Sequence, residues 1–215
     1  MIIRPFHRFF ALCLATAVFA GHATASTPPP APVEGRDYVL IADGKPFADA
    51  KGKIEVAEVF GYWCHFCNDF QPIVDAWKRK LPADVQFTYV PAAFDLDDPF
   101  ARGFFAAQQL GLLTRTHNAL FRAVHSTRDV PMNASASELA TFYAGFGIPA
   151  PRFIATMASP AVTAQMQRAR TFAQRSGISG TPSLIVAGRY RVTASSFDAQ
   201  LRIVDGLLAQ LRNSR

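Results

Sequence analysis

The chain has 215 residues, half of them apolar, with 22 Lys and Arg against 16 Asp and Glu, for a formal net charge of +6. Such an apolar content excludes a disordered chain, and the basic residues form no cluster of the kind that binds nucleic acid. We therefore expect one globular domain with a complete core, large enough to carry an inserted subdomain.

The N-terminus has the pattern of a secretory signal peptide. Arg4 and Arg8 precede the apolar run Phe9–Ala20, and an A-x-A cleavage motif ends at Ala25. The run is too short to be a permanent membrane anchor. Cleavage after Ala25 removes the charges of Arg4 and Arg8, so the net charge falls from +6 to +4. We expect an exported protein, which in a bacterium is periplasmic.

The next segments are a leader and two strands. Residues 26–36 are rich in proline and predict a stiff, extended leader outside the core. Tyr38–Ala42 and Ile54–Phe60 have the composition of strands. The period of two in the second strand places Glu58 on an otherwise apolar face.

Cys64 and Cys67 are the two cysteines that remain after cleavage, and two residues separate them. A disulfide that closes so short a loop contributes only about 2 kcal/mol in the chain-entropy model, which favours redox chemistry over a structural role. A predicted helix follows, to about Lys80, so Cys64 lies at its N-terminus, where an anion is stabilised. We expect Cys64 to be the nucleophile and Cys67 to resolve the mixed disulfide, and a protonated His65 could add positive charge beside the thiolate.

Two other interpretations of the cysteine pair are an inert disulfide and a zinc site. Zinc requires two further ligands at a suitable spacing. The remaining histidines, His117 and His125, lie far along the chain in a segment with helical periodicity. We therefore expect neither a metal nor an organic cofactor.

The rest of the chain changes from strand to helix and back. A strand is predicted at Val85–Val90, strands resume at Ser183–Ala187 and Tyr190–Thr193 around a Gly188-Arg189 turn, and a last helix covers Ser196–Leu211. Between them, helices are predicted near Pro99–Leu110, Thr114–Ser126, Ser137–Phe146, Pro151–Met157 and Ala161–Arg175, with Ser135 or Ser137 as a helix start. The pattern predicts an α/β domain of residues 37–97 and 178–213, interrupted by a helical insertion at 98–177.

Three segments together resemble a known family. Val59–Cys67 followed by a helix, Gly180-Thr181-Pro182, and Gly188-Arg189-Tyr190 resemble the thioredoxin superfamily. The helical block between them is similar to that of the DsbA family of periplasmic thiol:disulfide oxidoreductases. The resemblance implies a thioredoxin fold with an inserted all-helical subdomain, in which Pro182 is cis and faces the dithiol.

The resemblance also implies roles for residues around the dithiol. Thr181 and Pro182 would form a loop that hydrogen-bonds an extended substrate peptide near Cys64. Nearby aromatic side chains would offer an apolar groove or else pack in the core; they are Tyr62, Trp63 and Phe66. Glu58 matches the family's buried acid, which passes protons to or from Cys67. An exposed strand residue is the alternative for Glu58.

The sequence departs from the family pattern in three ways. The residues between the cysteines are His-Phe, where the best-known oxidants of the family have Pro-His, and this dipeptide influences the pKa of the thiol. Tyr89 stands about where some relatives place a lysine near the acid. A second cysteine pair, found in some relatives, is missing.

The function we expect is donation of the Cys64–Cys67 disulfide to reduced or unfolded exported proteins by a monomer, with a DsbB-like membrane quinone reductase as the reoxidising partner. A periplasmic reductase or isomerase is an alternative, although the roughly thirty residues before the core leave no room for an N-terminal dimerisation domain. A peptide-binding, chaperone-like protein is another alternative, and replacing Cys64 would separate it from an exchange enzyme.

Overall fold

A computed structural model describes residues 1–2 and 30–214. Residues 3–25 of the predicted signal peptide (1–25) and the start of the predicted leader (26–29) therefore lie outside the described residues. The strands are β1 (Tyr38–Leu40), β2 (Ile54–Phe60), β3 (Val85–Pro91), β4 (Ser183–Val186) and β5 (Tyr190–Val192). The helices are α1 (His65–Lys78), α2 (Pro99–Gln109), α3 (Leu113–His125), α4 (Ala136–Ala144), α5 (Ala150–Met157), α6 (Pro160–Arg175) and α7 (Phe197–Asn213). The predicted α/β class is confirmed. In the part of the chain that the structure describes, no helix is long and apolar enough to cross a membrane.

Strand β2 occupies the interior of a five-stranded sheet of order β1-β5-β4-β2-β3, parallel to β3 and antiparallel to β4. All seven of its residues are buried, because neighbouring strands and packed side chains surround it on every side. Glu55, on the face opposite Glu58, is buried as well. Its carboxylate accepts hydrogen bonds from the backbone N–H groups of Phe47 (2.7 Å) and Ala48 (2.8 Å), which satisfy the buried charge.

The turn between β4 and β5 lies one residue earlier than the sequence predicts. Its two central residues, Ala187 and Gly188, have φ angles of 52° and 66°, and the Arg189 N–H donates to the Val186 carbonyl. Positive φ at both central positions is the geometry that matches the twist of the strands on either side of a hairpin turn. The expected Gly188-Arg189 turn is therefore corrected to Ala187-Gly188.

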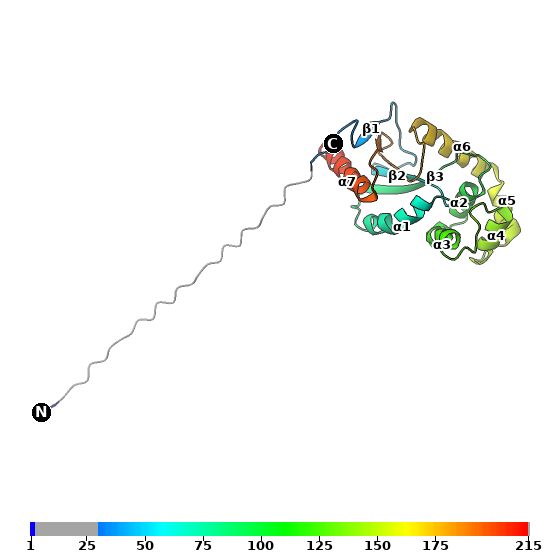
Figure 1. Cartoon of the computed structure of the whole chain (residues 1–215), viewed down its shortest axis with the longest axis horizontal. Helices are drawn as coiled ribbons and strands as arrows, with labels where there is room; N and C mark the ends of the chain where they lie inside the picture. The colour runs from blue at the N-terminus through cyan, green and yellow to red at the C-terminus, as the bar shows by residue number, and fades with distance from the viewer. Residues whose placement is uncertain (3–29, 215) are drawn as a thin grey trace.

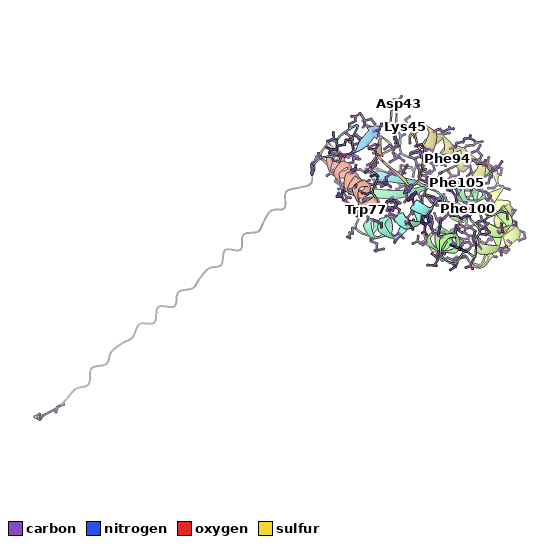
Figure 2. The ribbon with its side chains drawn as sticks, viewed as in Figure 1. Asp43, Lys45, Trp77, Phe94, Phe100 and Phe105 are labelled. Carbon is purple, nitrogen blue, oxygen red and sulfur yellow. The ribbon has the colours of Figure 1, made fainter. Side chains whose placement is uncertain are left out.

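Helices α1 and α7 share a hydrophobic cluster with β2 and β4, and the two helices lie side by side in Figure 1. The indole N–H of Trp77, near the end of α1, donates to Asp205 on α7 at 2.9 Å; Trp77 is labelled beside the two helices in Figure 2. The leader reaches the same layer, because a Cβ at Gly206 would lie only 2.6 Å from the ring of Pro32. The described end of the leader thus packs on the domain.

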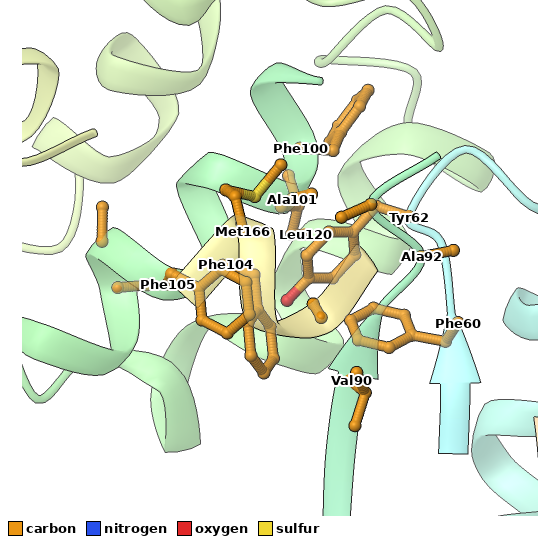
Figure 3. Packing of buried hydrophobic residues seen from close by; sticks show 14 of the residues in the cluster. Phe60, Tyr62, Val90, Ala92, Phe100, Ala101, Phe104, Phe105, Leu120 and Met166 are labelled. Atoms are coloured by element: carbon orange, nitrogen blue, oxygen red, sulfur yellow. The ribbon is translucent and has the colours of Figure 1, made fainter. Parts of the chain in front are cut away.

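Helices α2 to α6 lie between β3 and β4 in sequence and group together at one end of the molecule (Figure 1). Asp98 caps α2 by accepting from the Phe100 N–H, and Ser135 forms a capping box with Glu138 at the start of α4. Figure 3 shows Phe60 and Tyr62 from the sheet side among the side chains of these helices. The ring centroids of Phe60 and Phe104 are 5.4 Å apart, so the helices share a core with the sheet.

Candidate redox site

Cys64 is the N-cap residue of α1. Strand β2 ends at Phe60, and the chain turns through Gly61, where a Cβ would lie 2.7 Å from the Trp63 ring. The backbone of Cys64 is extended (φ −80°, ψ 117°), and its sulfur accepts a hydrogen bond from the Cys67 N–H at 3.2 Å. The strand-to-helix junction therefore presents the sulfur to the unpaired N–H groups of the helix.

The two thiols differ in acidity. Both are free, and Cys64 is 6% exposed whereas Cys67 is fully buried. A hydrogen bond from the Cys67 side chain, helped by Thr181 and by backbone N–H groups, lowers the pKa of Cys64 to about 6 despite its burial. Burial raises the pKa of the Cys67 thiol far above its ordinary value, and the hydrogen bond to Cys64 and the charge of Glu58 add to the rise. Near neutral pH, Cys64 is the thiolate of the pair.

The Thr181–Pro182 loop lies against the dithiol, although 117 residues separate Thr181 from Cys64 in sequence. The Thr181–Pro182 peptide bond is cis. The Cys64 sulfur is 3.2 Å from the Thr181 carbonyl oxygen. Strand β4 begins directly after this loop and pairs with β2, which is the tertiary contact that brings the two segments together.

A cleft of about 610 Å³ opens beside this loop between the N-terminal parts of α1 and α7. Phe66, whose exposed fraction is 65%, lies on one side of it. The cleft is lined by Phe66, Asp69, Ile73, Thr181, Pro182, Ala194, Ser195, Ser196, Phe197, Asp198 and Gln200. Three residues predicted from the sequence to bind substrate, Phe66, Thr181 and Pro182, are thus brought together.

Glu58 is buried in the sheet. Neither carboxyl oxygen has a hydrogen-bond partner among the residues that the structure describes, and the residue is 1% exposed. Burial raises the pKa of Glu58 to about 8, with Lys78 opposing the rise and the charges of Asp75 and Cys64 adding to it. The alternative of an exposed strand residue is therefore wrong. A carboxyl group with this pKa can hold or release a proton near neutral pH.

A polar network that the sequence did not reveal lies next to Glu58. Tyr89 is the residue opposite Glu58 on β3, and its hydroxyl accepts hydrogen bonds from Gln71 and Lys78, each at 2.7 Å. Lys78 also pairs with Asp75 at 2.8 Å. Lys78 therefore reaches Tyr89, the neighbour of Glu58, from the end of α1. The position of Lys78 in the helical pattern did not predict its contact with Tyr89.

Tyr62 packs in the core, which is one of the two alternatives that the sequence left open, and does not line the cleft. It is 1% exposed, and its hydroxyl is 2.8 Å from Nδ1 of His117, while its carbonyl oxygen is 2.7 Å from Nε2 of His125. The helical insertion thus holds the chain just before the dithiol. Trp63 does not line the cleft either. It is half-buried and packs against the core, and its indole N–H is 3.4 Å from Asp98.

His65 is exposed on the first turn of α1. Its Nε2 atom is 3.4 Å from Asp69, and its ring centroid is 6.0 Å from that of His125. The largest causes of the lowered pKa of Cys64 are hydrogen bonds with Cys67, Thr181 and the backbone rather than His65. Within residues 30–214, no three His, Cys, Asp or Glu side chains converge in a way that could hold a metal ion.

A thioredoxin fold with an acidic thiol at a helix N-terminus, a buried partner thiol and a cis-proline loop beside them defines a thiol:disulfide oxidoreductase. Comparisons with known proteins agree. Residues 98–203 match the family model described as a DSBA-like thioredoxin domain. The thiol:disulfide interchange protein DsbA of Azotobacter vinelandii is 36% identical over 210 residues, covering 95% of this chain and 97% of that protein.

Solved structures agree as well. The crystal structure of oxidoreductase DsbA from Xylella fastidiosa is 46% identical, with a TM-score of 0.82, and covers 86% of this chain and 100% of that one. The structure of Pseudomonas aeruginosa DsbA is 33% identical, with a TM-score of 0.75, and covers 84% of this chain and 94% of that one. The chain belongs to the DsbA family of thiol:disulfide interchange proteins.

Proposed function

We propose that the protein donates the Cys64–Cys67 disulfide to newly exported proteins. The observation that supports donation of the disulfide, rather than reduction of substrate disulfides, is the low pKa of Cys64, about 6. A stabilised thiolate favours the reduced form of the pair, so the oxidised form readily passes its disulfide on. The same thiolate is a good leaving group, which speeds release of the product.

The exchange takes place in two steps. A substrate thiolate attacks Cys64, forming a mixed disulfide and breaking the Cys64–Cys67 bond, so that Cys67 leaves with the electron pair. A second substrate thiolate then attacks the substrate sulfur of the mixed disulfide, and Cys64 leaves as a thiolate. The substrate loses two electrons and gains a disulfide, and the protein gains two electrons as a dithiol.

Glu58 serves as the proton donor in the first step. Cys67 leaves in a buried place where its pKa is far above the ordinary value, so it needs a proton as the bond breaks. The Glu58 carboxyl, with a pKa of about 8, holds a proton at neutral pH and interacts electrostatically with Cys67. In the reverse direction the same group, once ionised, accepts that proton.

The substrate chain lies in the cleft beside Cys64. An extended peptide there would pair with the backbone at Thr181 and Pro182, while Phe66 offers it an exposed apolar surface. A peptide bound in this way would bring its sulfur near Cys64 without a specific side-chain pocket. Such a site suits many unfolded chains rather than one defined ligand.

The site of action that we propose is the periplasm, on the basis of the signal-peptide pattern at residues 1–25 and of the family. Disulfides form and persist in that compartment. Each turnover leaves the dithiol, so a partner must remove two electrons. A membrane quinone reductase of the DsbB kind is the partner that we propose, with the protein acting as a monomer and holding no cofactor of its own.

The equilibrium of the mature protein with a glutathione redox buffer tests this direction. Reduced and oxidised forms are separated by thiol trapping, with Cys64→Ser as the variant that cannot exchange. We expect the disulfide to be reduced by mild glutathione mixtures. A disulfide that persists until the buffer is strongly reducing would instead support a reductase. Retention of all activity by Cys64→Ser would favour a chaperone-like binding protein.

A further inference from the structure

The cleft beside Cys64 carries an uneven charge. Most of its lining is apolar or uncharged, but Asp69 contributes a carboxylate from α1 and Asp198 contributes one from the first turn of α7. Among the residues that line the cleft, none is Lys, Arg or His. The cleft is thus negative although the chain as a whole has a net charge of +6.

Both carboxylates are accessible to a bound peptide. The Asp69 side chain is 46% exposed and its contacts are Asn68 at 3.2 Å and His65 at 3.4 Å, which leave much of the carboxylate facing solvent. Asp198 is exposed at the opposite helix. Since the two groups come from different helices that flank the cleft, a peptide lying in it passes between them.

Two arginines line a neighbouring cavity rather than the cleft. Arg36 and Arg202 lie in a separate cavity of about 330 Å³, which shares Ala194 and Ser195 with the cleft. Arg36 is already paired with Asp37 at 2.8 Å. The negative lining beside Cys64 is therefore not neutralised by a cation within the cleft itself.

We propose that the cleft selects substrate segments that carry Lys or Arg within a few residues of the reacting cysteine, with Asp69 and Asp198 as the specificity-determining residues. This inference rests on the proposed disulfide donation. A substrate reacts as a thiolate, and two carboxylates repel an anion that approaches Cys64. A flanking cation on the peptide removes that repulsion and pairs with the carboxylates, whereas a flanking Glu adds to it.

The experiment compares three peptides that each contain a single cysteine. They differ only at the positions two residues before and two residues after that cysteine, where one peptide has Lys, one has Gln and one has Glu. The oxidised, mature protein is mixed with each peptide, and the rate of mixed-disulfide formation is followed by Trp fluorescence or by acid quench. Because a flanking Lys also acidifies the peptide thiol, each rate is divided by the rate of the same peptide with hydroxyethyl disulfide, a neutral reagent.

After this correction we expect the Lys peptide to react about fivefold faster than the Glu peptide at low ionic strength, with the Gln peptide between them, since exposed ion pairs have effects of this size. The ratio should approach one at high salt because screening weakens exposed charges. In Asp69→Asn/Asp198→Asn the ratio should fall to about one. In Asp43→Asn it should persist, because Asp43 lies in the loop after β1 (Figure 2), does not line the cleft, and its φ of 51° suits Asn.

The outcomes separate the two proposals. Equal corrected rates for the three peptides, or a preference that survives high salt or the double substitution, overturn the charge selection while disulfide donation stands. Failure of the oxidised protein to react with any of the three peptides overturns the donation itself, and the selection with it.

Discussion

Nε2 of His125 lies 2.7 Å from the carbonyl oxygen of Tyr62, and this contact ties the helical insertion to the chain that leads into the dithiol. The hydroxyl of Tyr62 is held in the same way by His117, at 2.8 Å. Both histidines belong to α3. The position of the turn before Cys64 is therefore set by the insertion as well as by the sheet.

Replacing His125 by Ala should destabilise the protein by about 1–2 kcal/mol, because the carbonyl of the buried Tyr62 loses its partner. Urea unfolding of the oxidised protein measures this. His125→Gln, whose amide can donate to the same carbonyl, should recover most of the loss. His65→Ala is the control, with an expected change within about 0.5 kcal/mol for an exposed side chain. Equal stability of His125→Ala and wild type would contradict the role of this contact.

Replacing Cys67 by Ala should raise the pKa of Cys64 above its value of about 6, because the side-chain hydrogen bond from Cys67 is the largest cause of the lowering. The ultraviolet absorbance of the thiolate, followed across pH 4 to 9, reports the titration directly. In the reduced wild type the step should fall near pH 6, and it should vanish in Cys64→Ser. An unchanged midpoint in Cys67→Ala would assign the lowering to Thr181 and the backbone N–H groups of the helix N-terminus instead.

Replacing Glu58 by Gln should change how stability depends on pH. The pKa of Glu58 rises from 4.5 in the unfolded chain to about 8 in the fold, so the folded state holds more protons between these values and stability falls as pH rises through that window. The fall attributable to this group is on the order of 5 kcal/mol. In Glu58→Gln it should be absent.

The oxidised protein is the form to use, because Cys64 then has no thiol to titrate. In the reduced form the fold lowers the pKa of Cys64 from 9.0 to about 6. Stability therefore rises with pH between these two values, which is opposite to the effect of Glu58. Denaturant unfolding at pH 5 and pH 8 gives the comparison. Parallel pH curves for wild type and Glu58→Gln would contradict the raised pKa.

Replacing Gly188 by Ala should destabilise the protein by at least about 2 kcal/mol, since a residue with a side chain pays a penalty at a φ of 66°. The added Cβ would also lie 2.1 Å from the backbone carbon of Lys45, so the loop after β1 must move. Thermal unfolding measures the loss. Gly35→Ala is the matched control, because it has a φ of 80° but no atom within 4 Å. A similar effect in both variants would show that backbone strain alone is responsible.

The local pattern predicted much of this fold. The period of two at Ile54–Phe60 and the cysteine pair before a helical period were enough to place the dithiol at a strand-to-helix junction, as the structure has it. Both features depend only on residues that lie close together in the sequence. By contrast, the turn between β4 and β5 was misplaced by one residue, because a strand end cannot be separated from a turn by composition alone.

Contacts between segments that are far apart in the sequence could not be predicted from the local pattern. The sequence left Tyr62 open between a groove and the core, and it is buried because α3 supplies the two histidines that contact its hydroxyl and its carbonyl. The contact of Lys78 with Tyr89 likewise joins the end of a helix to a strand. A sequence lists these side chains without stating which of them meet.

The sequence by itself determined the α/β class and the closely spaced cysteine pair, with Cys64 as the first cysteine of that pair, because composition, period and spacing act over short stretches of chain. Only the tertiary structure decided the chemistry around that cysteine. The low pKa of Cys64 arises where α1 meets the Thr181–Pro182 loop, the carboxylates of the cleft come together from α1 and α7, and Glu58 is buried by the packing around β2. Hydrogen bonding and desolvation depend on such long-range packing, and it is these two effects that set the acidity of each group.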